Sequence, residues 1–314
     1  MNCVVIPAFR CADHIAAVVS GIGPDVDRIL VIDDACPDGS GKRVEETIGD
    51  PRVRVIYHAE NLGVGGAVKT GMREALAEGA TIIVKIDGDG QMDPGLIPRF
   101  LRPIRDGRAD YAKGNRFYNL SDLTEMPLVR LLGNAGLSLF SKASSGYWSV
   151  MDPTNGYIAI HASLVRLLPL DKISDRFFFE SDMLFRLATF RARVFEVSMP
   201  ARYRDEASSL SPTVSLFRFS ASHCKRFVKR FFYNYVLRDF NVATLASVFG
   251  VIALLFGVAF GANRWLLSIE SGVAATTGTV MVALLPVVLG AQLLLFAMQY
   301  DVANEPKDAI HPYL

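Results

Sequence analysis

The chain has 314 residues and a formal net charge of +1, so its global charge gives no reason to expect nucleic acid as a partner. Hydrophobic residues make up 51% of the chain, and this excess is concentrated after about residue 241. The four cysteines show no CxxC spacing and no disulfide framework, which fits a reducing compartment.

The first part of the chain predicts strands that alternate with helices. Short apolar runs at residues 3–6, 28–32, 53–57 and 81–84 predict the strands. Such alternation predicts a largely parallel sheet that binds ligands at the carboxyl ends of its strands. Three groups of residues fall at that edge, namely residues 7–9, Asp33 with Asp34, and Asp87 with Asp89.

The stretch KIDGDGQMDP at residues 85–94 is the strongest candidate site. Asp87 and Asp89 follow a strand two residues apart, so both side chains leave on the same side, and Gly88 keeps the backbone open between them. Gln91 adds a neutral oxygen, and such a set suits a hard cation such as Mg²⁺ or Mn²⁺. The alternative is a solvated acidic turn. The coincidence of three such groups on one edge favours a nucleotide-and-metal site.

The glycine-rich stretch at residues 61–66, NLGVGG, also opens a predicted helix. It lacks the G-K-[ST] ending of a Walker loop, and it does not follow the first strand. Its glycines are therefore expected to permit close packing more than to contact a phosphate.

Four segments, in this order and spacing, resemble glycosyltransferase family 2. They are VVIPAF at 4–9, VIDDACPDGSG at 31–41, NLGVGGAVKTG at 61–71 and IDGDGQ at 86–91. The chain is most similar to the polyprenyl-phosphate branch, which includes dolichol-phosphate mannosyltransferases and bacterial undecaprenyl-phosphate glycosyltransferases. This resemblance implies an α/β GT-A catalytic domain, with a Rossmann-like fold, that transfers sugar with inversion to a polyprenyl phosphate.

The resemblance also implies roles for individual residues. The metal, Mg²⁺ or Mn²⁺, would be held by Asp87, Asp89 and Gln91, and Asp89 would be catalytic. Arg10-Cys11 stands where the family often has Asn-Glu, so the donor stays open between a UDP-hexose and GDP-mannose. The nucleotide sugar would contact Pro7, Ala8, Phe9, Asp33, Asp34, Asp87, Gly88 and Asp152.

Cations near the end of a later predicted strand are candidates for the acceptor phosphate. Lys113 and Arg116 lie in DYAKGNRF at residues 110–117, and Arg forks phosphate oxygens well. The alternative is a pair of solvated surface cations. By the resemblance, Arg204 joins them, although its segment lacks the Gly and Lys of the family motif. Arg116 and Arg204 are expected to be catalytic.

Glu180 and Asp182 are similar to an acid pair of family members that glycosylate a hydroxyl, but Ser181 separates them. They could supply a general base, or cap a helix. A phosphate acceptor needs no base, because its second pKa is near 6. Besides transfer to a phosphate, two alternatives stay open. The first is transfer to a hydroxyl, and the second is a non-catalytic membrane-anchored protein that binds nucleotide sugars.

The end of the chain predicts two membrane spans, at residues 242–262 and 273–298, joined by a polar loop at 263–272. The preceding segment alternates cations with aromatic residues, as an interfacial helix on anionic lipid does. Its charge predicts a multi-pass protein of the cytoplasmic (inner) membrane with the catalytic domain in the cytoplasm.

These observations divide the chain into a GT-A domain (1–212), an amphipathic juxtamembrane helix (213–240), a transmembrane hairpin (241–300) and a cytoplasmic tail (301–314). The expected partners are a nucleotide-sugar donor, a polyprenyl phosphate such as undecaprenyl phosphate, and membrane lipid. Homo-oligomerisation stays open, and the product is expected to serve cell-envelope glycan assembly.

Overall fold

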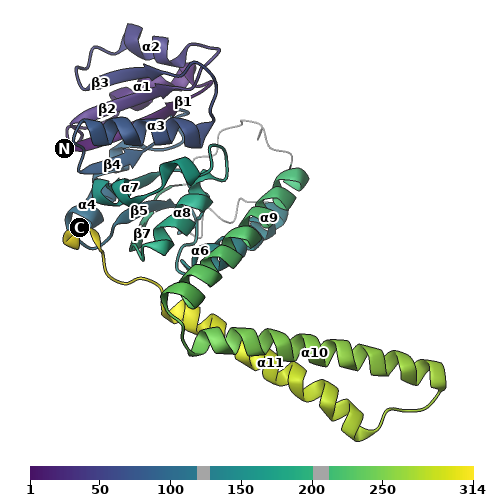
Figure 1. The fold of residues 1–314 in the computed structure, drawn as a ribbon. Coiled ribbons are helices and arrows are strands. Elements are labelled where there is room, and N and C mark those ends of the chain that lie inside the picture. Colours follow the sequence, from purple (N-terminus) through teal and green to yellow (C-terminus); the bar gives the residue numbers. More distant parts are fainter. Residues whose placement is uncertain (119–127, 201–211) are drawn as a thin grey trace. The chain divides into compact units, whose positions relative to one another are not determined.

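A computed structural model describes residues 1–118, 128–200 and 212–314 (Figure 1). Its contacts divide the chain into two compact units, which we treat separately. One unit comprises Met1–Phe227 together with Pro306–Leu314, and the other comprises Val228–Glu305.

The first unit is built on a seven-stranded sheet in the order β3-β2-β1-β4-β6-β5-β7. Neighbouring strands of the sheet pair in parallel, except that β6 runs antiparallel to both β4 and β5. The prediction of a largely parallel sheet is therefore confirmed. The strands are β1 (Asn2–Ala8), β2 (Arg28–Asp33), β3 (Val53–Tyr57), β4 (Ile82–Lys85), β5 (Tyr111–Asn115), β6 (Ile158–His161) and β7 (Val194–Ser198).

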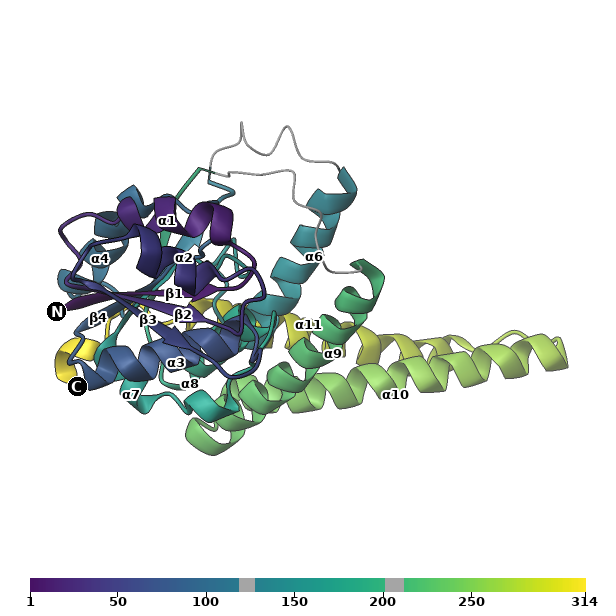
Figure 2. The same ribbon diagram turned by 90° about the horizontal axis from the view of Figure 1, so that it is seen from above.

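Helices cover both faces of this sheet, as Figure 2 shows. Alternate strand residues point to opposite faces, so Val4 packs in one apolar cluster and Val5 in the other. The helices on the Val4 face are α1 (Ala12–Ser20), α2 (Ser40–Thr47) and α4 (Ile97–Arg105). Those on the Val5 face are α3 (Val64–Ala77), α7 (Ala162–Leu167) and α8 (Phe179–Thr189).

The remaining helical segments follow these layers in the chain. The long ones are α6 (Leu128–Ser145) and α9 (Pro212–Phe231), and a π-helix (Phe232–Arg238) continues α9. Short 3₁₀ turns occupy Pro94–Leu96, Leu170–Lys172 and His311–Tyr313.

The last nine residues belong to the first unit. The buried carboxylate of Asp110 accepts hydrogen bonds from the backbone N–H groups of Ile310, at 3.0 Å, and of His311, at 2.7 Å. The imidazole of His311 lies 2.9 Å from the same carboxylate and stacks on His161, with 4.3 Å between ring centroids. The sequence analysis did not anticipate this packing, because nothing in the local pattern links residues 110 and 311.

The side chains in the first turns of α9 are not described, but two later residues of this helix contact other parts of the first unit. Arg226 Nε lies 2.7 Å from the buried carboxylate of Asp182, and His223 Nδ1 lies 2.8 Å from Ser144 Oγ. Arg226 is therefore paired inside the protein. The sequence analysis did not anticipate this pairing, because Asp182 lies far from Arg226 along the chain.

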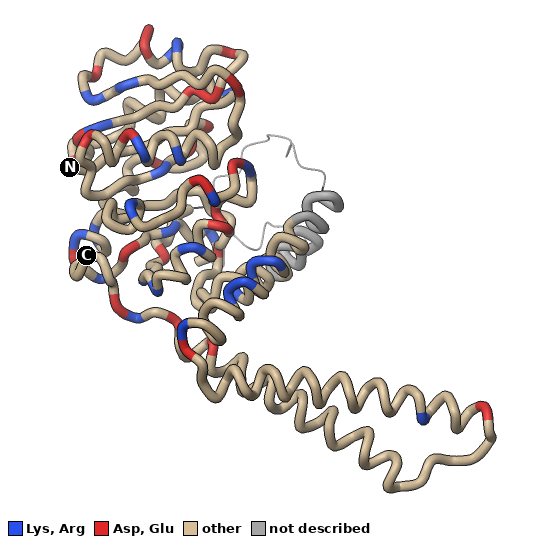
Figure 3. Tube along the Cα trace, viewed as in Figure 1, with Lys and Arg blue, Asp and Glu red and all other residues tan. Residues whose placement is uncertain are grey.

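The second unit is a pair of long apolar helices, α10 (Val242–Ser271) and α11 (Thr277–Ala303). Both are long and apolar enough to cross a membrane, by length and composition. Figure 3 shows almost no charge along them. The predicted polar loop at 263–272 is wrong, since α10 runs on through Ser271.

Glycines let these two helices approach closely. A Cβ added at Gly257 would lie 2.7 Å from the Ala283 carbonyl, and one at Gly250 would lie 3.1 Å from the Gly290 carbonyl. Gly250 lies beside Gly290 and Gly257 beside Ala283, so residue numbers rise along one helix where they fall along the other. The two helices are therefore antiparallel. At the base of the pair, Arg230 and Asp301 form a buried ion pair at 2.7 Å.

Candidate active site

A cavity of about 390 Å³ opens where β1, β2 and β4 end. These strands run in parallel, so their carboxyl ends bring distant parts of the sequence together. The cavity gathers seven of the residues expected to bind donor or metal: Pro7, Ala8, Phe9, Asp34, Asp87, Gly88 and Asp89.

Asp33, which was also expected to contact the nucleotide, does not line this cavity. Its buried carboxylate accepts hydrogen bonds from the backbone N–H groups of Cys36 and Gly41, both at 2.7 Å. These bonds close the turn after β2 and fix the start of α2. The geometry therefore gives Asp33 a local structural task.

Asp34 lines the cavity and also organises the glycine-rich stretch at 61–66. Its carboxylate accepts hydrogen bonds from the N–H groups of Leu62, at 2.9 Å, and Gly63, at 2.8 Å. A Cβ at Gly65 would collide with the carbonyl of Ser174. The close packing expected of these glycines is therefore present at Gly65, and Gly63 also lines the cavity.

The acidic stretch contains a buried ion pair that the sequence analysis missed. Lys85, the last residue of β4, has a side chain only 1% exposed, and its Nζ lies 2.7 Å from Asp87 Oδ1 and 3.9 Å from Glu180 Oε1. Burial alone would lower the pKa of Lys85, but Asp87 and Glu180 outweigh it, and the pKa is raised. Lys85 is therefore a cation among carboxylates at the cavity wall.

Glu180 connects this cavity to a second, smaller one of about 140 Å³. Asp87 and Glu180 line both cavities, whereas Gln91 and Arg116 line only the smaller one. Burial raises the pKa of Glu180, and the nearby Lys85 and Lys113 oppose that rise. The two cavities are therefore neighbours that share an acidic wall.

The oxygen donors of the acidic stretch fit a hard divalent cation. Asp87 and Asp89 contribute carboxylates to the larger cavity, and Gln91 borders the smaller one. Within the described residues, no group of three or more His, Cys, Asp and Glu is placed to hold a metal alone. Such a sparse donor set suits Mg²⁺ or Mn²⁺, which keep positions for substrate oxygens and water.

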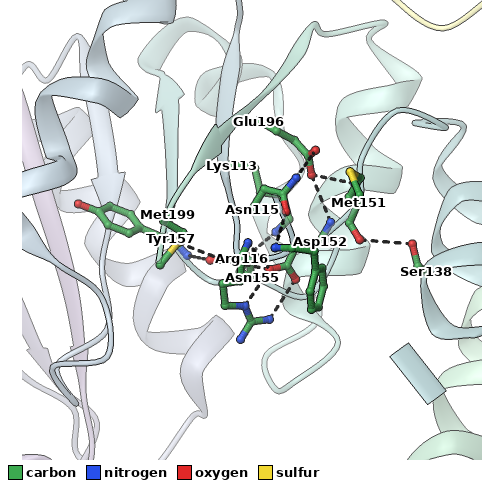
Figure 4. Close-up of polar contacts among 11 residues, drawn as sticks. Lys113, Asn115, Arg116, Ser138, Met151, Asp152, Asn155, Tyr157, Glu196 and Met199 are labelled. Carbon is green, nitrogen blue, oxygen red and sulfur yellow. Dashed lines mark hydrogen bonds and ion pairs between the residues drawn. The ribbon is translucent and has the colours of Figure 1, made fainter. Parts of the chain in front are cut away.

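Arg116 reaches the smaller cavity from the end of β5 and is held by Asp152 (Figure 4). Its Nε and Nη2 donate to the two carboxylate oxygens at 2.8 and 3.0 Å, and its backbone N–H donates to Oδ2 at 3.2 Å. Burial would raise the pKa of Asp152, but Arg116 outweighs it and the pKa is lowered. Asp152, expected at the sugar, lines neither cavity and instead positions this arginine.

Lys113 and Arg204 complete the predicted acceptor site. Lys113 is fully buried and donates to the carbonyl of Asn155, and it lines neither cavity. Burial lowers its pKa to about 8. The structure thus places Lys113 behind the wall of the site, not at its surface. Arg204 lies outside the described residues.

The two carboxylates considered as bases have different surroundings. Asp182 is fully buried, accepts a hydrogen bond from the Ser174 N–H at 3.0 Å and pairs with Arg226. Glu180 faces both cavities. Of the two, only Glu180 is placed to meet a substrate.

The cavity also contains residues that the sequence pattern did not single out. Arg176 and Phe177 line it together with Lys85. Arg176 and Phe177 come from the segment before α8, and only the tertiary fold brings that segment beside β1 and β4. For Lys85, a charged residue at the end of an apolar strand was the available signal.

Comparison with known proteins places this site in a family. Residues 3–168 match the family model described as glycosyl transferase family 2. A UDP-N-acetylglucosamine–dolichyl-phosphate N-acetylglucosaminyltransferase of Methanococcus voltae is 32% identical over 178 residues, 52% of this chain and 70% of that protein. An undecaprenyl-phosphate mannosyltransferase of Micrococcus luteus is 34% identical over 176 residues, 55% of this chain and 71% of that protein.

Solved structures share the fold. Glucosyl-3-phosphoglycerate synthase from Mycobacterium tuberculosis, in complex with Mn²⁺, UDP and glucosyl-3-phosphoglycerate, superposes with a TM-score of 0.54 at 20% identity. The match covers 73% of this chain and 79% of that one. The predicted GT-A fold is thereby confirmed.

Proposed function

This chain belongs to glycosyltransferase family 2, and from that premise we propose that it transfers a sugar, with inversion, from a nucleotide sugar to the phosphate of a polyprenyl phosphate. The donor would be a UDP-hexose or GDP-mannose. The observation that carries the proposal is the pair of adjoining cavities, one with the acidic stretch and one with Arg116, which share Asp87 and Glu180.

The named activities of its relatives support this acceptor. The Methanococcus voltae relative is named for transfer to dolichyl phosphate, and the Micrococcus luteus relative for undecaprenyl phosphate. A third, polyprenol monophosphomannose synthase of Mycolicibacterium smegmatis, is 28% identical over 208 residues. We infer the same acceptor class here.

On the donor side, residues 7–9 and Asp34 would form the floor for the nucleotide in the larger cavity. Asp87, Asp89 and Gln91 would hold the divalent cation, whose chemistry is to stabilise charge on the departing diphosphate. The solved structure with Mn²⁺ and UDP supports a cation of this kind in this fold.

On the acceptor side, Arg116 would bind the phosphate in the smaller cavity, oriented by its pair with Asp152. A phosphate monoester is largely dianionic at pH 7, so no side chain must remove a proton from it. Its attack on the anomeric carbon requires alignment and charge neutralisation instead. Inversion follows from a single displacement without an enzyme nucleophile.

The position of Glu180 is the one observation that supports the alternative function, transfer of the sugar to a hydroxyl acceptor. Burial raises the pKa of Glu180, and this residue lines both cavities, as a general base for a hydroxyl acceptor would. We favour the phosphate acceptor because Arg116 occupies the same cavity and because the named relatives use lipid phosphates.

The apolar pair α10 and α11 would anchor the enzyme as a two-span hairpin in the cytoplasmic membrane. The first unit, residues 1–227 with 306–314, would be the catalytic unit, and the chain enters the hairpin from this unit and returns to it. Both ends of the hairpin would therefore lie on the catalytic side of the bilayer. Cations before the first span favour the cytoplasm for that side.

The test is a donor screen with the purified full chain in detergent. Radiolabelled UDP-glucose, UDP-N-acetylglucosamine and GDP-mannose are each offered with undecaprenyl phosphate and, in parallel, with undecaprenol, in the presence of Mg²⁺, Mn²⁺ or EDTA. We expect one donor to label the lipid, in a cation-dependent manner, with an acid-labile phosphodiester linkage. Labelling of undecaprenol in preference to its phosphate would favour the hydroxyl acceptor, and nucleotide binding without transfer would favour a non-catalytic role.

A further inference from the structure

The buried ammonium of Lys85 needs an explanation, because a lysine inside a protein is costly unless it is paired. It is the last residue of β4, and it contacts Asp87 closely and Glu180 more distantly. We propose that Lys85 is a positioning residue that fixes the carboxylate of Asp87 for a divalent cation. The inference rests on the proposed metal-dependent function.

The hydrogen-bonding pattern of Asp87 carries the first step. Lys85 Nζ engages Oδ1 at 2.7 Å, and the backbone N–H of Asp87 donates to Met92 Sδ at 3.3 Å. The ion pair therefore uses one carboxylate oxygen and leaves Oδ2 for a ligand. Carboxylates that bind metals are commonly oriented by such an outer partner, whose loss costs about 10–100-fold in metal affinity.

The backbone at Gly156 gives independent evidence that the positions of Lys85 and Asp87 are fixed by their surroundings. A Cβ added there would collide with Lys85 Nζ and lie 3.0 Å from Asp87 Oδ2. The backbone at residue 156 thus closes over the ammonium and the carboxylate, and only glycine leaves room for both. A substitution at Gly156 would therefore displace the pair without removing a charge.

The direction in which metal affinity changes when Lys85 is removed distinguishes a positioning role from a purely electrostatic one. A cation beside a metal ligand repels the metal, so if Lys85 acted by Coulomb repulsion alone its removal would strengthen metal binding. If it positions Asp87, its removal weakens metal binding. The two explanations therefore predict opposite changes.

The experiment titrates the full chain in detergent with Mn²⁺, followed by electron paramagnetic resonance, alone and with UDP or GDP. Lys85→Met is expected to weaken Mn²⁺ binding about 10–100-fold. The matched control is Lys69→Met, because Lys69 is also a buried lysine, donating to the Ile173 carbonyl at 3.0 Å, but lines neither cavity. It should leave Mn²⁺ affinity within about twofold of wild type, below the loss expected for an outer partner.

Gly156→Ala keeps the test decisive if Lys85→Met does not fold. It should weaken Mn²⁺ binding as well, with all charges retained. Unchanged or tighter binding in a folded Lys85→Met or Gly156→Ala variant would overturn the inference, as would a wild-type chain that binds no Mn²⁺. Weakened Mn²⁺ binding in a chain that transfers no sugar would instead overturn the proposed function and leave the inference standing.

Discussion

Arg116 and Asp152 form a two-pronged ion pair, with Nε 2.8 Å from one carboxylate oxygen and Nη2 3.0 Å from the other. The carboxylate is fully buried, whereas the guanidinium is 30% exposed and borders the smaller cavity. The buried partner therefore fixes the direction of the exposed one. This relationship connects the stability of the domain to its proposed acceptor site.

Arg116→Ala is expected to lower the free energy of unfolding by about 3–5 kcal/mol, because it removes the ion-pair partner of a buried carboxylate. Denaturant unfolding of the full chain in detergent measures the change. The control is Arg102→Ala, whose pair with Asp106 is exposed and should contribute less than about 1 kcal/mol. Equal, small effects of both changes would show that the Arg116–Asp152 pair contributes little.

Arg116→Lys and Glu180→Gln distinguish the two acceptors with less disturbance of the fold. Lysine keeps the charge but loses the fork, so kcat/KM for undecaprenyl phosphate should fall more than tenfold, the cost of about 1.4 kcal/mol of lost phosphate contact. Glu180→Gln cannot accept a proton but keeps its shape, and should cost little. A hydroxyl acceptor reverses this order, with a loss of about 10²–10⁴-fold for Glu180→Gln.

Asp89→Asn should abolish turnover and leave the fold intact, because it removes one charge from the proposed cation site. Asp93→Asn is the matched control in the same stretch, since Asp93 caps the turn at Pro94–Leu96 and lines neither cavity. Sugar transfer at limiting Mn²⁺ is the measurement. Turnover near the wild-type rate in Asp89→Asn would show that Asp89 is not part of the cation site.

Buried His223 predicts a loss of stability in acid. Burial lowers its pKa to about 4, against about 6.5 in an unfolded chain, so the unfolded state binds the proton first. Its contribution to the free energy of unfolding is complete above pH 6.5 and declines toward pH 4, by about 2 kcal/mol at pH 5. Denaturant unfolding at pH 7 and pH 5 should show this loss, and His223→Gln should reduce it. An identical pH dependence in both proteins would contradict the assignment.

A shortened chain that ends at residue 212 should fold poorly. It lacks Arg226 and His311, the partners of the buried carboxylates of Asp182 and Asp110. Residues 1–227 joined to 306–314 by a flexible linker should restore both pairs and give a folded protein. Size-exclusion chromatography and thermal unfolding compare the two, and equal behaviour would mean that these pairs are dispensable.

The sequence predicted the amino-terminal half of the sheet closely, because apolar runs bounded by turns are local signals. The predicted strand at 53–57 coincides with β3, and β2 ends only one residue beyond its predicted end. Residues 7–9, Asp34, and Asp87 with Asp89, which stand at the ends of three of these strands, were correctly expected to meet, since parallel strands end at one edge.

The features of the fold and of the site that the sequence did not predict depend on contacts between distant segments. No local pattern reveals that β6 inserts antiparallel between β4 and β5, or that Asp182 pairs with Arg226. Lys85 was read as the start of an acidic turn, although β4 includes it, because its buried partner Glu180 lies far along the chain. The extension of α10 was missed because polar residues in a helix end resemble a loop.

The place of residues 306–314 in the catalytic unit has a consequence for biosynthesis. A ribosome would complete both apolar helices before it makes the segment that covers Asp110. Domains generally fold as they emerge, amino-terminal part first. Here the catalytic unit would remain unfinished until after the hairpin had left the ribosome, so the membrane insertion proposed for the hairpin would come before the final step of its folding.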